Sequence, residues 1–124
     1  MGFQDDWVLR QVEMIAAFVG QVVFHHKTVK YEIINKDELS STDILYLKIQ
    51  SLLKEGKICQ AEDMLFDNIE YNDRYVELAT DFYQKLNKLT VKELEQCNFS
   101  KEEIYDGFLD ILEKLKIPVE QFKQ

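Results

Sequence analysis

The longest apolar run in the chain lies between Trp7 and Phe24, and its periodicity predicts one long helix. At about 100° of rotation per residue, one arc of roughly 100° holds Arg10, Glu13, Ala17, Gly20, Gln21 and Phe24. The apolar positions on the rest of the wheel are Trp7, Val8, Leu9, Val12, Met14, Ile15, Ala16, Phe18, Val19, Val22 and Val23. So wide an apolar surface must be covered by more than one neighbour. We therefore expect residues 5–27 to form a long central helix.

A membrane-spanning helix is the other interpretation of this run, because such a helix needs about 20 predominantly apolar residues. The run is interrupted by Arg10, Gln11, Glu13 and Gln21. We therefore predict a helix buried inside a water-soluble bundle, with no membrane contact.

The segment 28–41 alternates apolar and charged residues, a pattern that taken alone is typical of a β-strand. Its apolar positions are Val29, Tyr31 and Ile33, with Lys30 and Glu32 between them. A strand needs a partner, and no other segment of the sequence offers a convincing one. We predict an ordered connection, with room for a short helical turn near Asp37 to Leu39.

Residues 42–70 have the pattern of a tight helical hairpin. Ser41 or Thr42 opens its first helix, and Gly56 ends that helix as a C-cap in the left-handed region. The second helix follows at once, and its inward positions are Ile58, Ala61, Leu65 and Ile69. So short a turn requires the two helices to be antiparallel.

The C-terminal helices are expected within residues 73–117. Their starts are marked by N-cap residues and capping boxes: Asn72 or Asp73, Thr90 with Glu93, and Ser100 with Glu103. Pro118 ends the last helix, and the tail from Val119 is expected to be weakly ordered. The whole chain, 1–124, is predicted to be a single all-α domain, a helical bundle of about five to six helices.

Composition supports this class and restricts the partners. One proline and four glycines leave little room for β-turns, which favours helices. The formal net charge of -8 repels phosphate backbones and anionic lipid, so we expect neither nucleic acid nor a membrane as partner. The charge is consistent with simple solubility and with a basic partner, and the sequence leaves both open.

The two cysteines, Cys59 and Cys97, form no Cys-x-x-Cys motif and no Cys/His cluster, so we expect no zinc site and no cofactor. Both thiols are expected to be reduced and mostly buried. The start of the chain does not have the pattern of a secretion signal.

Four carboxylates of the last helix fall within about 80° of the wheel and form an acidic stripe: Glu103, Asp106, Asp110 and Glu113. Like charges at i,i+4 cost a few tenths of a kcal/mol, which suggests divalent-cation binding or docking of a basic peptide. The alternative is a solvated face on which Lys114 relieves Asp110. A row on one straight helix spans too far to wrap one ion, so no metal ligands are assigned.

Four aromatic residues fall off the predicted inner faces: Phe24, Tyr46, Phe66 and Tyr71. They could line a binding groove or a homo-oligomer patch. A core wider than the helical wheels suggest would also explain them. The sequence offers no nucleophile with a neighbouring base and no phosphate-binding glycine loop. No catalytic residues are therefore assigned, and we do not expect an enzyme.

The hairpin resembles a tetratricopeptide-type repeat, which has a glycine at its tight turn and an alanine at the close helix contact. The matching positions are Gly56, Ile58, Ala61, Leu65 and Ile69. The chain departs from the pattern at Leu45 and Ile49. A second copy of the repeat, offset by about 34 residues, would need a glycine at position 90, where the chain has Thr90 instead.

Taken whole, the chain resembles a small family of uncharacterised bacterial helical proteins that carry a domain of unknown function. The resemblance is carried by Trp7 to Glu13, by Leu53 to Ile58 with Ala61-Glu62, by Phe82-Tyr83 with Lys85-Leu86, and by Asn98-Phe99-Ser100 with Glu102-Glu103-Ile104. It implies a cytoplasmic bacterial protein with an all-α fold related to tetratricopeptide proteins. It implies no activity and no catalytic residues.

These features lead to three functional hypotheses. The first is a non-enzymatic interaction module that binds a protein or peptide, or pairs with itself. The second is a small-ligand binder or cryptic enzyme with a pocket between the first helix and the hairpin, using for instance Arg10, Glu13 and His25. The third is divalent-cation binding on the acidic face of the last helix.

Overall fold

The computed structural model describes residues 2–25 and 28–123, with side chains from residue 6 onward. This part of the chain contains six α-helices, one π-helical turn, one 3-10 turn and no strand. The elements are α1 (Gly2–Val19), η1 (Gly20–Phe24), α2 (Ser41–Lys54), α3 (Ile58–Asp67), α4 (Asp73–Asn87), α5 (Val91–Gln96), α6 (Lys101–Lys114) and η2 (Glu120–Phe122). The all-α bundle predicted from the sequence is confirmed.

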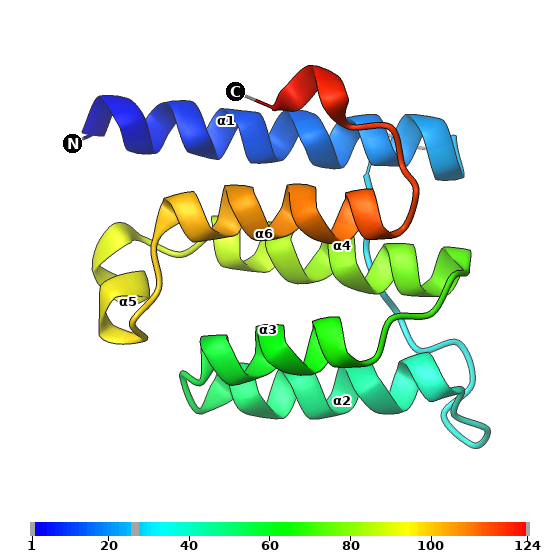
Figure 1. Cartoon of the computed structure of the whole chain (residues 1–124). Coiled ribbons are helices and arrows are strands. Elements are labelled where there is room, and N and C mark those ends of the chain that lie inside the picture. The colour runs from blue at the N-terminus through cyan, green and yellow to red at the C-terminus, as the bar shows by residue number, and fades with distance from the viewer. Residues whose placement is uncertain (1, 26–27, 124) are drawn as a thin grey trace.

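The long helices lie side by side in three tiers (Figure 1). The α1 helix forms one outer tier, α4 and α6 form the middle tier, and the α2–α3 hairpin forms the other outer tier. The α1 helix packs on both α4 and α6, and α2 packs on α4. The buried apolar side chains form one cluster to which all six helices contribute.

The middle position belongs to α4, and the prediction of a central α1 was wrong. Ten of the fifteen residues of α4 are buried, whereas α1 buries one stripe that includes Val12, Ile15 and Val19. Met14 and Val22 of the first helix are 54% and 47% exposed. The helical wheel overestimated how much of the α1 surface is buried, because folded proteins leave many apolar side chains in contact with water.

The segment Asp6–Phe24 is long and apolar enough to cross a membrane, the one such segment in the described residues. In this fold the side chains of Val12, Ile15 and Val19 are fully buried within the common core. A buried core helix can be as long and as apolar as a membrane-spanning helix, so length and composition do not distinguish the two.

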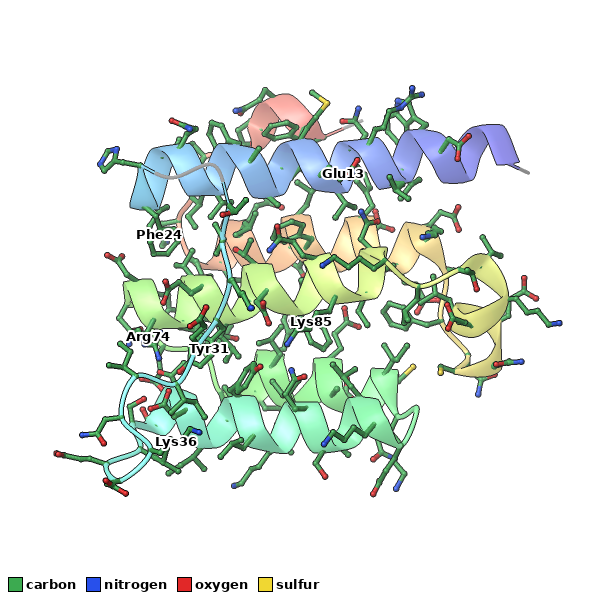
Figure 2. All side chains as sticks on the ribbon, turned by 180° about the vertical axis from the view of Figure 1, so that it is seen from behind. Glu13, Phe24, Tyr31, Lys36, Arg74 and Lys85 are labelled. Carbon is green, nitrogen blue, oxygen red and sulfur yellow. The ribbon has the colours of Figure 1, made fainter. Side chains whose placement is uncertain are left out.

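A π-helical turn changes which side chains at the end of α1 face the core. The α-helix stops at Val19, and Gly20–Phe24 forms a π turn with i→i+5 hydrogen bonds. Phe24, expected on the polar arc, is half-buried and points toward the middle tier (Figure 2). The wheel assumed uniform α-helical rotation, and the wider turn rotates the residues that follow.

The hairpin turn follows the expected geometry at its glycine. Gly56 has a φ of 75°, and the amides of Gly56 and Lys57 donate to the carbonyls of Leu53 and Leu52 at 3.0 and 2.9 Å. These two bonds are typical of a helix that ends at a left-handed residue. The α2 helix begins at Ser41, one of the two predicted starts, and its N-cap is Ser40, which forms a capping box with Asp43.

The C-terminal tail is packed, so the prediction of a weakly ordered tail was wrong. Val119 is fully buried, and the ring of Phe122 meets that of Phe18 edge-on at 5.4 Å. The hydroxyl of Tyr105 donates to the carbonyl of Phe122. The tail therefore covers the side of α1 that faces away from the middle tier (Figure 1).

The connection from 28 to 40 crosses the middle tier as an extended chain and lies against α4 (Figure 2). Three α4 side chains hold its backbone: Gln84 donates to the Val29 carbonyl at 2.6 Å, Arg74 donates to the Glu32 carbonyl at 2.8 Å, and Asp81 accepts from the Tyr31 amide at 3.3 Å. These side chains take the place of a partner strand. The predicted helical turn is instead a single tight turn, closed by the Glu38 amide donating to the Asn35 carbonyl at 3.3 Å.

Tyr31 joins this connection to α2 and α4 through a buried carboxylate. Its hydroxyl donates to Asp43 at 2.5 Å, and Arg74 lies 3.0 Å from the same oxygen and 4.1 Å from the Tyr31 ring centroid. Burial raises the pKa of Asp43, but the hydrogen bonds from Tyr31 and Ser40 and the Arg74 charge outweigh it and lower that pKa. We call Tyr31, Asp43 and Arg74 the connection clamp.

Tyr31→Phe tests the connection clamp. The change removes the hydroxyl from a charged, buried partner, so we expect the free energy of unfolding to fall by about 1.5–3 kcal/mol in a urea titration. Tyr71→Phe removes the same atom from a side chain that is 74% exposed, and should change stability by less than about 0.5 kcal/mol. Equal losses in the two variants would contradict the clamp.

Candidate functional site: an acidic cleft between α3 and α6

A cleft of about 360 Å³ opens between α3 and α6. It is lined by Glu62, Asp63, Phe66, Glu103, Asp106, Gly107 and Asp110. Five of these side chains are carboxylates, and no basic residue is among the described residues that line the cleft. We call this surface the acidic cleft.

The α6 wall of the acidic cleft is three-quarters of the predicted acidic stripe. Glu103, Asp106 and Asp110 line it, while Ile104, Phe108 and Ile111 on the other face of α6 are buried. Spacings of three and four residues put like side chains on one helix face, which explains the segregation.

Glu113, the fourth residue of the stripe, does not line the cleft. Its carboxylate forms an ion pair with Lys123 of the C-terminal tail. Lys114 lies 3.7 Å from Asp110, as the i,i+4 spacing predicts. The stripe is therefore partly neutralised at the C-terminal end of α6 and not at its other end, within the residues described.

The α3 wall of the acidic cleft is formed by residues that lie at the edge of the buried face of α3. Ala61 and Leu65 are fully buried, and Glu62 and Phe66, one position further on, are half-buried at the rim of the core. The spacing of four residues puts Glu62 and Phe66 on the same face. Phe66, one of the predicted interaction aromatics, gives the acidic cleft its apolar surface.

Gly107 forms the floor of the cleft, and any side chain there would force Glu62 or Tyr83 to shift. A Cβ at this position would lie 2.3 Å from a carboxylate oxygen of Glu62 and 2.6 Å from the hydroxyl of Tyr83. That hydroxyl, which comes from α4, donates to Glu62 at 2.5 Å. Neither Glu62 nor Tyr83 was predicted as a site residue, although both belong to segments that carry the family resemblance. A glycine inside a helical pattern was the available signal.

The environment of Glu62 disfavours its charged form. Burial raises the pKa of Glu62, the Tyr83 hydrogen bond opposes this, and the charges of Glu103, Asp63 and Asp110 raise it further. The net direction is upward from the ordinary value of 4.5. Burial and the nearby Glu62 also raise the pKa of Tyr83, so its phenol remains a donor.

Three other predicted contact residues lie outside the acidic cleft. Tyr46 stacks on Tyr31 with ring centroids 4.7 Å apart, so it supports the connection clamp. Phe24 packs against the core, and Tyr71 is exposed beyond the end of α3. The four aromatic candidates therefore do not line one common groove.

A second cavity, of about 500 Å³, lies between α1 and the start of the α4–α5 connection. Glu13 lines it, whereas Arg10 and His25 do not. The amide of Asn87 donates to the Leu9 carbonyl at 3.1 Å, and its side-chain oxygen is buried without a hydrogen-bond partner. The predicted pocket between α1 and the hairpin was misplaced, because the middle tier separates those two elements (Figure 1).

Within residues 2–25 and 28–123, no group of three or more His, Cys, Asp or Glu side chains is placed to hold a metal ion. Cys59 is exposed and Cys97 is half-buried. The expectation of mostly buried thiols was therefore wrong for Cys59, which lies on the outer side of the first turn of α3.

Residues 2–116 match the model of a family described as Family of unknown function (DUF6483). The chain belongs to this family. Both walls of the acidic cleft lie within the DUF6483 region, which covers all six α-helices. No match was found among curated proteins or among solved structures. The bacterial origin and the tetratricopeptide resemblance of this DUF6483 chain stay predictions.

Glu62→Gln tests the electrostatics of the cleft. A carboxyl whose pKa is raised by folding binds its proton more tightly in the folded state, so its contribution to stability falls as pH rises above 4.5. We expect the melting temperature of Glu62→Gln relative to the native chain to increase with pH through this window. Glu102→Gln, in an exposed acid of α6 outside the cleft, should give no such slope. Parallel pH profiles for all three proteins would contradict a raised pKa.

Gly107→Ala tests the floor. The added methyl displaces the Glu62 carboxylate or the fully buried Tyr83, and we expect a loss of about 1–3 kcal/mol in the free energy of unfolding. In a Tyr83→Phe background the closest phenolic atom is absent, so the same change should cost less. A double-mutant cycle by urea titration measures the difference. If Gly107→Ala lowers the free energy of unfolding equally in the native and Tyr83→Phe chains, the clash does not involve the Tyr83 hydroxyl.

Proposed function

We propose that this protein is a non-enzymatic binding module whose acidic cleft docks a basic segment of a partner protein. The observation that carries the proposal is the convergence of five carboxylates and Phe66, from two helices distant in sequence, on one concave surface. The described residues that line it include no cation to balance them.

The repulsion within the acidic cleft favours a cationic ligand. Burial, and after it the charges of Glu103, Asp63 and Asp110, disfavours the negative charge of Glu62 and raises its pKa. A lysine or arginine side chain from a partner would relieve this repulsion. Such complementarity increases the association rate and selects against acidic partners.

The apolar part of the cleft suits the same ligand. Lysine and arginine have long aliphatic stems that pack on apolar surface while their charged ends reach carboxylates. The ring of half-buried Phe66 is available to such a stem, or to the cation itself. A basic segment would therefore use both kinds of surface in the cleft.

A small-ligand function is the second candidate, and it belongs to the cavity beside α1. Its support is the buried Asn87 oxygen without a hydrogen-bond partner, which a donor group of a ligand could satisfy after local movement. Cation binding has less support, since no three ligating side chains converge in the described part of the chain.

Asp106→Lys tests the proposed docking. The probe is a fluorescent synthetic peptide rich in lysine and arginine, with a lysine-free acidic peptide as the negative probe. Reversing the charge of a residue that lines the cleft should weaken binding about tenfold, equivalent to about 1.4 kcal/mol. Added salt should weaken binding to the native chain, because it screens exposed charges.

Glu102→Lys is the matched control, because it makes the same charge change on the same helix outside the acidic cleft. If both variants lose affinity equally, attraction is due to overall charge and the cleft proposal is wrong. No binding of the basic peptide at low salt would also overturn it.

A further inference from the structure

Two thiols from distant parts of the sequence lie near the same end of the hairpin. Cys59 is in the first turn of α3, and Cys97 is the C-cap of α5. The Cys97 sulfur lies 3.4 Å from the position that a Cβ on Gly56 would take. The Cys59 sulfur lies 3.7 Å from the carbonyl oxygen of Asn98. Each sulfur therefore contacts a residue close in sequence to the other cysteine.

The two thiols are near enough to influence each other and are open to reagents. Cys97 is among the groups that act electrostatically on Cys59. Cys59 is exposed and Cys97 half-buried, so small molecules can reach the pair. Both cysteines lie at helix ends, where local opening costs less than in the middle of a helix.

We infer that Cys59 and Cys97 are a redox-sensitive pair that closes into an intramolecular disulfide and fastens the hairpin to α5. The inference does not depend on the proposed function of the acidic cleft. Its physical basis is that the start of α3 and the end of α5 approach each other in space. Along the chain these two segments are separated by the rest of α3, by α4 and by α5.

The reaction requires an oxidant, and a small organic disulfide such as oxidised glutathione supplies it. One cysteine thiolate attacks the oxidant and forms a mixed disulfide, releasing one glutathione thiol. The other cysteine thiolate attacks the protein sulfur of that bond and releases the second glutathione thiol. Overall, the two protein thiols lose two hydrogens, and the oxidant is reduced to two thiols.

The surroundings of Cys59 slow this reaction near neutral pH. Partial desolvation of its sulfur, with the negative charges of Glu103, Glu62 and Asp63, raises the pKa of the Cys59 thiol although the residue is exposed. The thiolate is the reactive form, so the rate should increase with pH. A slow, pH-dependent closure distinguishes this pair from a catalytic dithiol.

The disulfide would add a covalent attachment between the hairpin and α5. The closed loop has about 40 residues, long enough for a large effect on the unfolded chain. The hairpin otherwise meets the middle tier mainly where α2 packs on α4. Cross-linking should therefore stabilise the protein and restrain the α3 wall of the acidic cleft.

The experiment uses the full chain, equilibrated with oxidised glutathione at alkaline pH and then analysed by thiol titration, intact mass and thermal melting. We expect a monomer lacking two hydrogens, no free thiols, and a melting temperature raised by about 5–15 °C, reversed by a reductant. Cys59→Ser and Cys97→Ser each retain a single cysteine, which should take up one glutathione, and neither variant should show such a rise.

Three results would overturn the inference. The first is a native chain that takes up two glutathiones without forming an internal bond. The second is covalent dimers as the main product. The third is an internal disulfide that leaves the melting temperature unchanged, because such a bond would not fasten the hairpin to α5. If the reduced serine variants melt at the same temperature as the reduced native chain, misfolding is excluded as the cause of their behaviour.

Discussion

The attachment of the outer hairpin to the rest of the protein depends on a buried polar contact beside the apolar core. The chain leaves α1 at one outer tier and must cross α4 before it can begin α2. An extended chain without a partner strand leaves its amides and carbonyls unpaired, which is costly where water is excluded. Side chains of α4 pair with that backbone, and the hydroxyl of Tyr31 carries the connection on to Asp43 of α2. The connection clamp therefore fixes where α2, and with it α3, lies relative to the middle tier.

The position of α3 determines the acidic cleft. Because the hairpin is one rigid pair, placing α2 on α4 also brings the polar edge of α3 beside α6. Gly107 lets the helices approach, and the approach leaves Glu62 in contact with Tyr83 below three acids of α6. The energy that holds these like charges together comes from the apolar core beneath them, where Ala61, Leu65 and Phe108 are fully buried.

The two features for which we propose roles lie on the same short helix. Cys59 precedes Glu62 by three residues, so the thiol lies near the end of the acidic cleft, and the cleft acids act on it. A single element with one buried face and one acidic, thiol-bearing face can support both binding and oxidation without disturbing the core. This arrangement is consistent with a binding module whose α3 wall is the adjustable part.

Most of the helices and their ends could be predicted from the amino-acid sequence, because their signals are local. Gly56 at the hairpin turn and the Thr90–Glu93 capping box satisfy backbone groups within one turn, so neighbouring residues decide them. The acidic stripe on α6 was likewise readable from spacing within one helix.

The packing of those helices against each other could not be predicted in this way and became visible in the folded structure. It placed α4 rather than α1 at the centre, paired Tyr83 with Glu62, joined Glu113 to the tail, and brought Cys59 near Cys97. These contacts join residues far apart in sequence, and no local pattern encodes which faces meet. The physical reason is that apolar burial is non-directional, so it favours any close packing of the apolar faces. One packing arrangement is selected by close steric fits, such as that at Gly107, and by polar contacts, such as the connection clamp.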